Sequence, residues 1–166
     1  MLAIGACTKT ESPSTASTTT KPPTTGSTTA PPPPTTGSES AAKTAYLVEV
    51  NALCKTMNES VAALASAPPG ADGAAKGAAI NQITKLVADT VATARNVASP
   101  PGDEAEVANV WVTADTFVVV ATTYGAALTA GDNEEATSLA IEVDARQSEA
   151  NDAANAYGLT ECGKGS

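Results

Sequence analysis

The chain has 166 residues, enough for one ordinary domain and a tail. Apolar residues make up 42% of it but aromatic residues only 3%, so a core built mainly from Ala and Val should be thin. The 9 Lys and Arg residues against 18 Asp and Glu give a formal charge of −9, which argues against nucleic acid and anionic membrane surfaces as electrostatic partners.

The segment Ile4-Gly5-Ala6-Cys7 lies near the start of the chain. It resembles the bacterial lipobox, in which an aliphatic residue and two small residues precede a cysteine. The resemblance implies an exported lipoprotein, anchored at the extracytoplasmic face of the cell membrane by a diacyl lipid on Cys7 with chains such as palmitate. Residues 1–7 are then the remnant of a signal peptide and its lipobox. A full signal peptide has a basic region and about 7–15 apolar residues. Since Met1 to Ala6 hold no Lys or Arg, the start lies upstream, the chain is shortened, or the match is coincidental.

Residues 8–42 have a different composition. They hold seven of the chain's 11 prolines and many threonines, but no Leu, Ile, Val or aromatic residue. Such a segment cannot bury enough apolar surface to offset its ordering entropy, so we expect a disordered linker with polyproline-like stretches. It suits a spacer between a membrane and a domain. Thr/Pro-rich tracts are typical O-glycosylation substrates, and an inert linker without sugars fits equally well.

Residues 43–166 return to apolar spacing of three and four residues, which is typical of helices. The first predicted helix runs from Tyr46 to the break at Pro68-Pro69-Gly70, because proline cannot continue a helix. Its apolar face is Val50, Cys54, Met57, Val61 and Leu64. The second helix is predicted over about 72–98, and the sequence Ser99-Pro100-Pro101-Gly102 ends it.

The third and fourth predicted helices carry capping signals at both ends. Asp103 has a glutamate three residues later, the spacing of a capping box, and Gly131 stands where a C-terminal cap is expected. Asp132 starts the fourth helix with the same spacing, and Gly158 followed by Leu159 fits a Schellman ending. Four helices of similar length with short loops predict an all-α, up-down-up-down four-helix bundle after the linker.

In this topology, the start of the first helix, the end of the second, the start of the third and the end of the fourth lie at the same pole of the bundle. Tyr46, Trp111 and Tyr157 should gather at the pole nearest the linker. Cys54 lies on the core face about two to three turns from that pole, and Cys162 follows Tyr157 by a stretch that reaches back roughly 16 Å. A disulfide between the two cysteines is therefore geometrically reasonable, and two free thiols are the alternative.

A cysteine in the first helix, Ala-rich helices with Pro-Pro loops, and the ending Gly158-Leu159-Thr160-Glu161-Cys162 are found together in this chain. In these features it resembles small actinobacterial, mycobacterial-type helical lipoproteins of uncharacterised function. The resemblance covers the chain after Cys7. It implies a cell-envelope location and the Cys54–Cys162 disulfide, and it implies no activity.

No residue pattern predicts catalysis. The chain has no His, which excludes Ser-His-Asp and Cys-His arrangements and the usual His zinc sites. Glu135, Glu142 and Glu149 recur every seven residues, but they lie off the apolar seam and are expected to form a solvated face. We therefore expect no enzyme, no catalytic residue, no metal site and no cofactor.

The third helix is apolar nearly all round, because Asp115 is its only charge between Val107 and Ala130. Such a helix is either well covered or presents a second face to something. Its length permits a membrane span, which Asp115 and the threonines oppose. The alternatives to a covered helix are an apolar cavity and an exposed docking strip for lipid or a partner protein. The residues of this candidate face are Trp111, Phe117, Val118, Val119, Val120 and Tyr124.

We expect a surface-displayed binding or structural module of the cell envelope, held to the membrane through the lipid on Cys7 and contacting an envelope protein or polymer. The alternative is a carrier or sensor of a lipid or another small apolar ligand held between the helices. An exposed Val-rich strip on the third helix favours the first function. An enclosed void beside Phe117, Val120 and Tyr124 favours the second.

Overall fold

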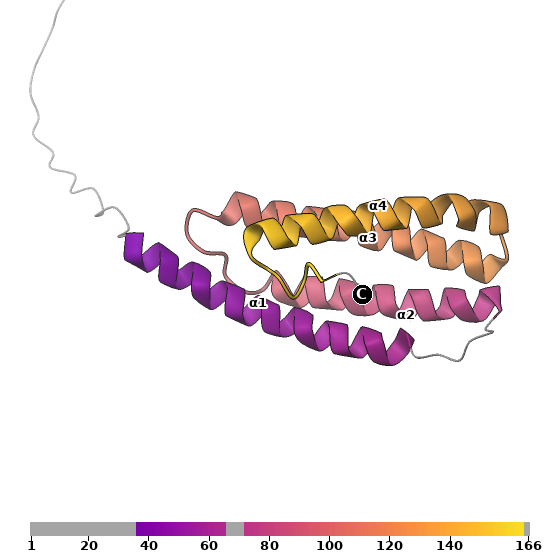
Figure 1. Ribbon diagram of the computed structural model, residues 1–166, viewed down its shortest axis with the longest axis horizontal. Helices are drawn as coiled ribbons and strands as arrows, with labels where there is room; N and C mark the ends of the chain where they lie inside the picture. The colour runs from indigo at the N-terminus through magenta and orange to yellow at the C-terminus, as the bar shows by residue number, and fades with distance from the viewer. Residues whose placement is uncertain (1–35, 66–71, 165–166) are drawn as a thin grey trace, which may run out of the picture. The chain divides into compact units, whose positions relative to one another are not determined.

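The computed structural model describes residues 36–65 and 72–164. These residues contain four helices and no strand: α1 (Thr36–Ala65), α2 (Gly73–Ala94), α3 (Glu104–Ala130) and α4 (Asn133–Tyr157). Consecutive helices run in opposite directions (Figure 1), which confirms the predicted up-down-up-down four-helix bundle. Cys7 and residues 8–35 of the expected linker lie outside the described residues.

Helix α1 begins earlier than the composition indicated. It starts at Thr36, inside the segment 8–42 that was assigned to the linker. The last proline of that segment is Pro34, so no later residue blocks a helix, and Ala41 and Ala42 favour one. A helix anchored further along the chain extends at low cost, because only its nucleation is expensive. The helical domain therefore starts before Lys43.

The predicted glycine endings of α3 and α4 and the predicted cap at the start of α4 are confirmed. The side chain of Asp132 accepts a hydrogen bond from the Glu135 amide at 3.1 Å. Gly131 and Gly158 follow α3 and α4 with φ of 75° and 103°, in the left-handed region that glycine adopts without strain. The capping box predicted at Asp103 is wrong, because its carboxylate forms no capping hydrogen bond and is held by groups of other helices.

Helix α2 ends at Ala94, short of the predicted residue 98. Arg95, at this end, turns its guanidinium toward α3. It donates a hydrogen bond to the Trp111 carbonyl at 3.1 Å and pairs with the Asp115 carboxylate at 2.5 Å. The single charge within the apolar stretch of α3 is thus neutralised in an exposed ion pair, so it does not prevent α3 from packing in the bundle.

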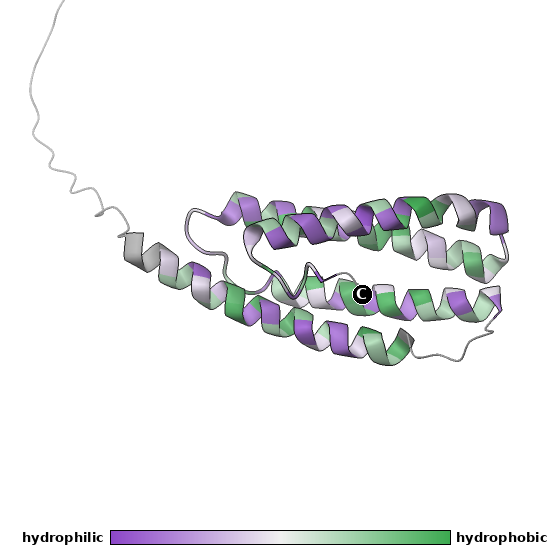
Figure 2. Cartoon of the chain, in the orientation of Figure 1, coloured by the Kyte–Doolittle hydropathy of each residue, from purple (hydrophilic) through white to green (hydrophobic). Residues whose placement is uncertain are grey.

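Helix α3 packs on α2 and on α4, whereas α1 packs on α2. In Figure 2 the visible side of α4 carries long hydrophilic stretches, in keeping with an outer position for that face. Tyr46, Trp111 and Tyr157 belong to one buried cluster, as the topology predicted. The cluster consists of Tyr46, Val50, Cys54, Val91, Ala94, Val107, Val110, Trp111, Ala154, Tyr157 and Leu159.

Small residues set the distance between α2 and α3 at the opposite end of the bundle. A Cβ atom on Gly77 would lie 2.6 Å from the Gly125 carbonyl oxygen, and a Cβ on Gly125 would lie 3.2 Å from the Ile80 side chain. The two helix backbones can approach this closely only because both positions lack a side chain. Glycine and alanine thus replace large apolar residues in this part of the core.

Candidate ligand-binding site

The end of α4 sends the chain back toward α1. The Leu159 amide donates to the Ala154 carbonyl at 2.8 Å and the Gly158 amide donates to the Asn155 carbonyl at 3.0 Å, the two hydrogen bonds of a Schellman motif. The Leu159 side chain is fully buried at 0% exposure. The sequence therefore folds residues 159–164 onto the bundle, and we call this segment the C-terminal strap.

The strap lies between α1 and α4, whose backbones stay further apart than those of the other neighbouring helices. Among the described residues, no Cα atom of α1 comes within 8 Å of one in α4. Figure 1 shows the chain after α4 crossing toward α1 and α2. The strap therefore joins two helices whose backbones do not approach each other closely.

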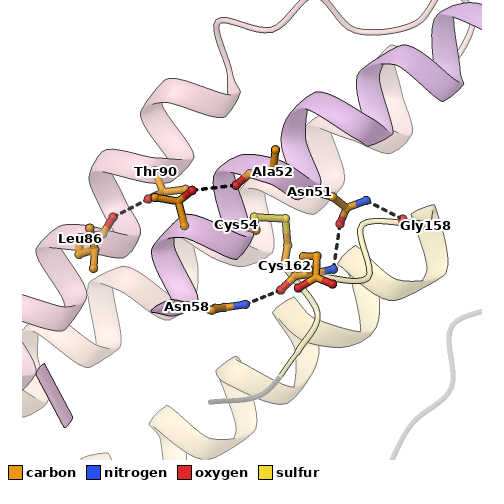
Figure 3. Close-up of a disulfide and its surroundings, with 10 residues drawn as sticks. Asn51, Ala52, Cys54, Asn58, Leu86, Thr90, Gly158 and Cys162 are labelled. Atoms are coloured by element: carbon orange, nitrogen blue, oxygen red, sulfur yellow. Dashed lines mark hydrogen bonds between the residues drawn. A yellow bond between two sulfur atoms is a disulfide. The ribbon is translucent and has the colours of Figure 1, made fainter. Parts of the chain in front are cut away.

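A disulfide and three asparagines attach the strap to both helices. Figure 3 shows the disulfide and the two asparagines of α1. Cys54 of α1 and Cys162 form a disulfide with a Cα–Cα distance of 5.0 Å, which confirms the pairing expected from the topology. On α1, Asn51 accepts from the Glu161 amide at 2.8 Å and Asn58 donates to the Glu161 carbonyl at 2.8 Å. On α4, Asn155 donates to the Gly163 carbonyl at 3.0 Å.

Beneath the strap lies a cavity of about 100 Å³ in the middle of the bundle. All four helices and the strap line it, and most of the lining side chains are apolar. An engineered apolar cavity of about 150 Å³ stays dry and binds benzene, so a space of this size accepts a small apolar group. The apolar lining includes Val61, Ile83, Val87, Trp111, Phe117 and Ala150.

Apart from Thr90 of α2, the polar lining residues gather on one side of the cavity. Asn58 of α1, Gln147 and Asn151 of α4 and Lys164 of the strap belong to the α1–α4 side, where the two helix backbones are well separated. The Lys164 side chain is 61% exposed, so the cavity reaches solvent there. The Asn58 side chain is hydrogen-bonded to the strap, whereas the side-chain amides of Gln147 and Asn151 form no hydrogen bond with any described residue. The site thus has an apolar interior and a mouth with unused amide groups.

Only some residues of the face predicted on α3 point into the cavity. Trp111 and Phe117 line the cavity, and Trp111 is buried. Val119 is 65% exposed and points away from the core, as does Val112, which is 59% exposed. Val118, Val120 and Tyr124 are half-buried and line none of the cavities described here. The void is therefore beside Phe117, as the carrier hypothesis required, but not beside Val120 or Tyr124.

The structure also assigns roles to residues that the sequence analysis did not select. Gln147 and Asn151 are separated by one helical turn and face the same opening. The sequence does contain a pattern that could have indicated them. The apolar seam of the fourth helix is interrupted between Val143 and Ala150, where a heptad pattern would have another apolar residue. Arg146 and Gln147 occupy that interval.

A second cluster holds the pole near the start of α1. The Tyr46 and Tyr157 rings meet edge to face with centroids 6.0 Å apart. The Tyr157 hydroxyl donates to the Asp103 carboxylate at 2.9 Å, and the Lys43 ammonium pairs with the same carboxylate oxygen at 2.9 Å. Lys43 also lies 4.3 Å from the centre of the Tyr157 ring. The cluster ties α1, α4 and the start of α3 together.

The pKa shifts in this cluster fit a structural role. The hydrogen bond from Lys43 and then that from Tyr157 lower the pKa of Asp103. Burial, followed by the hydrogen bond to Asp103, raises the pKa of Tyr157. Burial raises the pKa of Tyr46, and the neighbouring Trp111 indole offsets part of this rise. The Tyr46 hydroxyl and the Trp111 indole nitrogen lie close together but do not form a hydrogen bond of good geometry. A tyrosine held in its neutral form is a poor general base.

No group of three or more His, Cys, Asp or Glu side chains that could hold a metal ion is present in the described part of the chain. Glu142 and Glu149, expected on a solvated face, are exposed and pair with Arg146. By length and composition α3 could cross a membrane, but the core helix of a soluble protein meets the same criterion, and α3 packs against α2 and α4.

Comparisons with known proteins find no match: no protein-family model, no curated protein and no solved structure matches the chain.

Proposed function

We propose that this chain is a lipid-anchored protein of a bacterial cell envelope whose helical bundle binds a small apolar molecule, or the apolar end of a larger one. The observation that carries the binding proposal is the cavity of about 100 Å³ lined by all four helices. Ligand sites are typically concave and mostly apolar, with a few polar groups at fixed positions. This cavity has that composition, although it is smaller than most ligand sites.

The proposal keeps the expected surface display and favours the small ligand over the docked protein. Val112 and Val119 are exposed on α3, but they stand two helical turns apart and singly exposed apolar residues are ordinary on protein surfaces. The cavity, in contrast, joins side chains from elements far apart in the sequence, such as Val61, Phe117 and Ala150.

Trp111 provides a direct test of binding. It is the only tryptophan of the chain and it lines the cavity. A short alkyl iodide that enters the cavity should quench Trp111 fluorescence by the heavy-atom effect, with a saturable dependence on concentration. Ala150→Leu places additional carbon atoms in the cavity and should abolish the saturable part. Ala145→Leu, at an exposed position of the same helix, is the matched control and should quench like the wild type.

Equal, non-saturable quenching in the wild type and in Ala150→Leu would contradict the proposal. A native mass spectrum of the full chain isolated from its own envelope supplies an independent check. Extra mass that is lost on denaturation supports an apolar ligand, and a bare protein mass weakens the proposal.

The anchor is tested separately. In the full-length gene product, Cys7→Ser removes the sulfur to which the lipid would be attached, so we expect the protein to leave the membrane fraction. A Cys7→Ser protein that stays in that fraction would place the anchor elsewhere.

A further inference from the structure

We infer that the ligand of the cavity is an uncharged amphiphile, with an apolar end inside the bundle and a hydroxyl or amide group held at the mouth by Gln147 and Asn151. This inference rests on the proposed function and specifies the chemical class of the ligand. A cavity of about 100 Å³ accommodates only a short alkyl or small aromatic fragment. A larger ligand must therefore leave its remaining part at the opening.

The fold determines where the cavity opens to solvent. On the α2 and α3 sides, the lining residues are apolar except Thr90, whose hydroxyl already donates to the Leu86 carbonyl (Figure 3). On the α1–α4 side the lining includes Gln147 and Asn151, and no Cα atom of α1 comes within 8 Å of one in α4. The polar end of a bound amphiphile can therefore reach solvent only between α1 and α4, beside the strap.

The amide groups at this opening suit an uncharged partner. Each offers a donor and an acceptor, and neither is used by the described residues. A hydroxyl or amide of the ligand can both donate and accept, so it can satisfy these groups without an added charge. A ligand that covers these amides displaces water from them, which costs free energy unless the ligand forms hydrogen bonds with them. The site therefore prefers ligands that have a hydroxyl or an amide there.

A negatively charged end is disfavoured by the surrounding charges. The Lys164 ammonium is already paired with Glu161 at 2.5 Å. The Arg146 guanidinium, next to Gln147 in the chain, pairs with Glu149 at 2.9 Å and with Glu142 at 3.5 Å. The whole chain has a formal charge of −9. A carboxylate or phosphate at the mouth would thus lose hydration without gaining an unpaired cation.

The test compares two six-carbon probes that differ only at the polar end: an alkanol and an alkanoate, each with iodine on the opposite end. Iodine inside the cavity quenches Trp111, so both affinities are measured on the full chain at pH 7 by the same signal. We expect saturable quenching by the alkanol and at least a 10-fold weaker affinity for the alkanoate. An alkanoate that binds as tightly as the alkanol would overturn the inference and leave the proposed function standing.

Two variants locate the polar contact. Gln147→Met and Asn151→Leu remove the amides while keeping similar size, and each should weaken alkanol binding roughly 3- to 10-fold, the usual effect of one hydrogen bond. Binding of a plain alkyl iodide should not change, which separates this effect from misfolding. Gln82→Met, at an exposed position of α2 outside the cavity lining, is the matched control.

The outcomes separate the two proposals. Unchanged alkanol affinity in both variants would overturn the inference, because the polar end would then lie elsewhere. Failure of the plain alkyl iodide to bind the wild type would instead overturn the proposed function.

Discussion

The Cys54–Cys162 disulfide should contribute a large part of the stability of this bundle. It joins residues separated by 108 positions, so it closes almost the entire helical domain into one loop. On the chain-entropy model, a loop of this length destabilises the unfolded state by about 5 kcal/mol. A domain of this size has a total unfolding free energy of about 5–15 kcal/mol. Removal of the bond in a Cys54→Ala/Cys162→Ala double variant should therefore cost at least a third of the total.

Urea unfolding monitored by Trp111 fluorescence measures this loss. With a slope of about 2 kcal/mol/M, typical of a small domain, the midpoint should fall by about 2–3 M. Leu159→Ala is the informative comparison, because it removes buried packing at the same strap while the disulfide keeps the loop closed. It should cost about 2–5 kcal/mol. If the double variant unfolds at the wild-type midpoint while Leu159→Ala is destabilised, the entropy argument is refuted.

Two further predictions concern packing and pH. Gly77→Ala should destabilise the bundle by about 1–3 kcal/mol in urea unfolding, because its Cβ would lie 2.6 Å from a carbonyl oxygen of α3. Gly73→Ala is the control, because the nearest atom to its Cβ would be 3.3 Å away, and it should change the urea midpoint far less. Stability should fall as pH drops below the usual Asp pKa, because the pKa of Asp103 is lowered in the fold, and as pH rises above 10, because that of Tyr157 is raised. Asp103→Asn should remove part of the acid loss and keep most of the alkaline loss, since burial is the main cause at Tyr157.

The number of helices and most of their ends could be predicted because local residues determine them. Proline pairs break the chain at fixed points, and Gly131 and Gly158 end helices by a backbone conformation that needs no tertiary contact. The disulfide followed from topology, since antiparallel helices bring Cys54 and the chain end to the same pole. These conclusions needed no knowledge of side-chain packing.

The inward face of α3 could not be predicted for a physical reason. A helix that is apolar nearly all round gives no contrast between sides, so its orientation depends on the crossings with α2 and α4. Those crossings place Trp111 and Phe117 inward and Val119 outward. The error at Asp103 has a related cause, because its carboxylate binds Lys43 and Tyr157, which lie far from it in the sequence, and not the backbone amides of α3.

The thin core and the cavity have a common origin in the distribution of side-chain sizes. At one end of the bundle, glycines let α2 and α3 approach until their backbones nearly touch, as at Gly77 and Gly125. Nearer the other end, larger side chains such as Trp111 and Phe117 hold the helices apart, while alanines such as Ala150 leave space between them. There no Cα atom of α1 comes within 8 Å of one in α4, and the disulfide-bonded strap joins the two helices. A covalent link can hold this side of the bundle together without filling it, which leaves both a cavity and an opening to it.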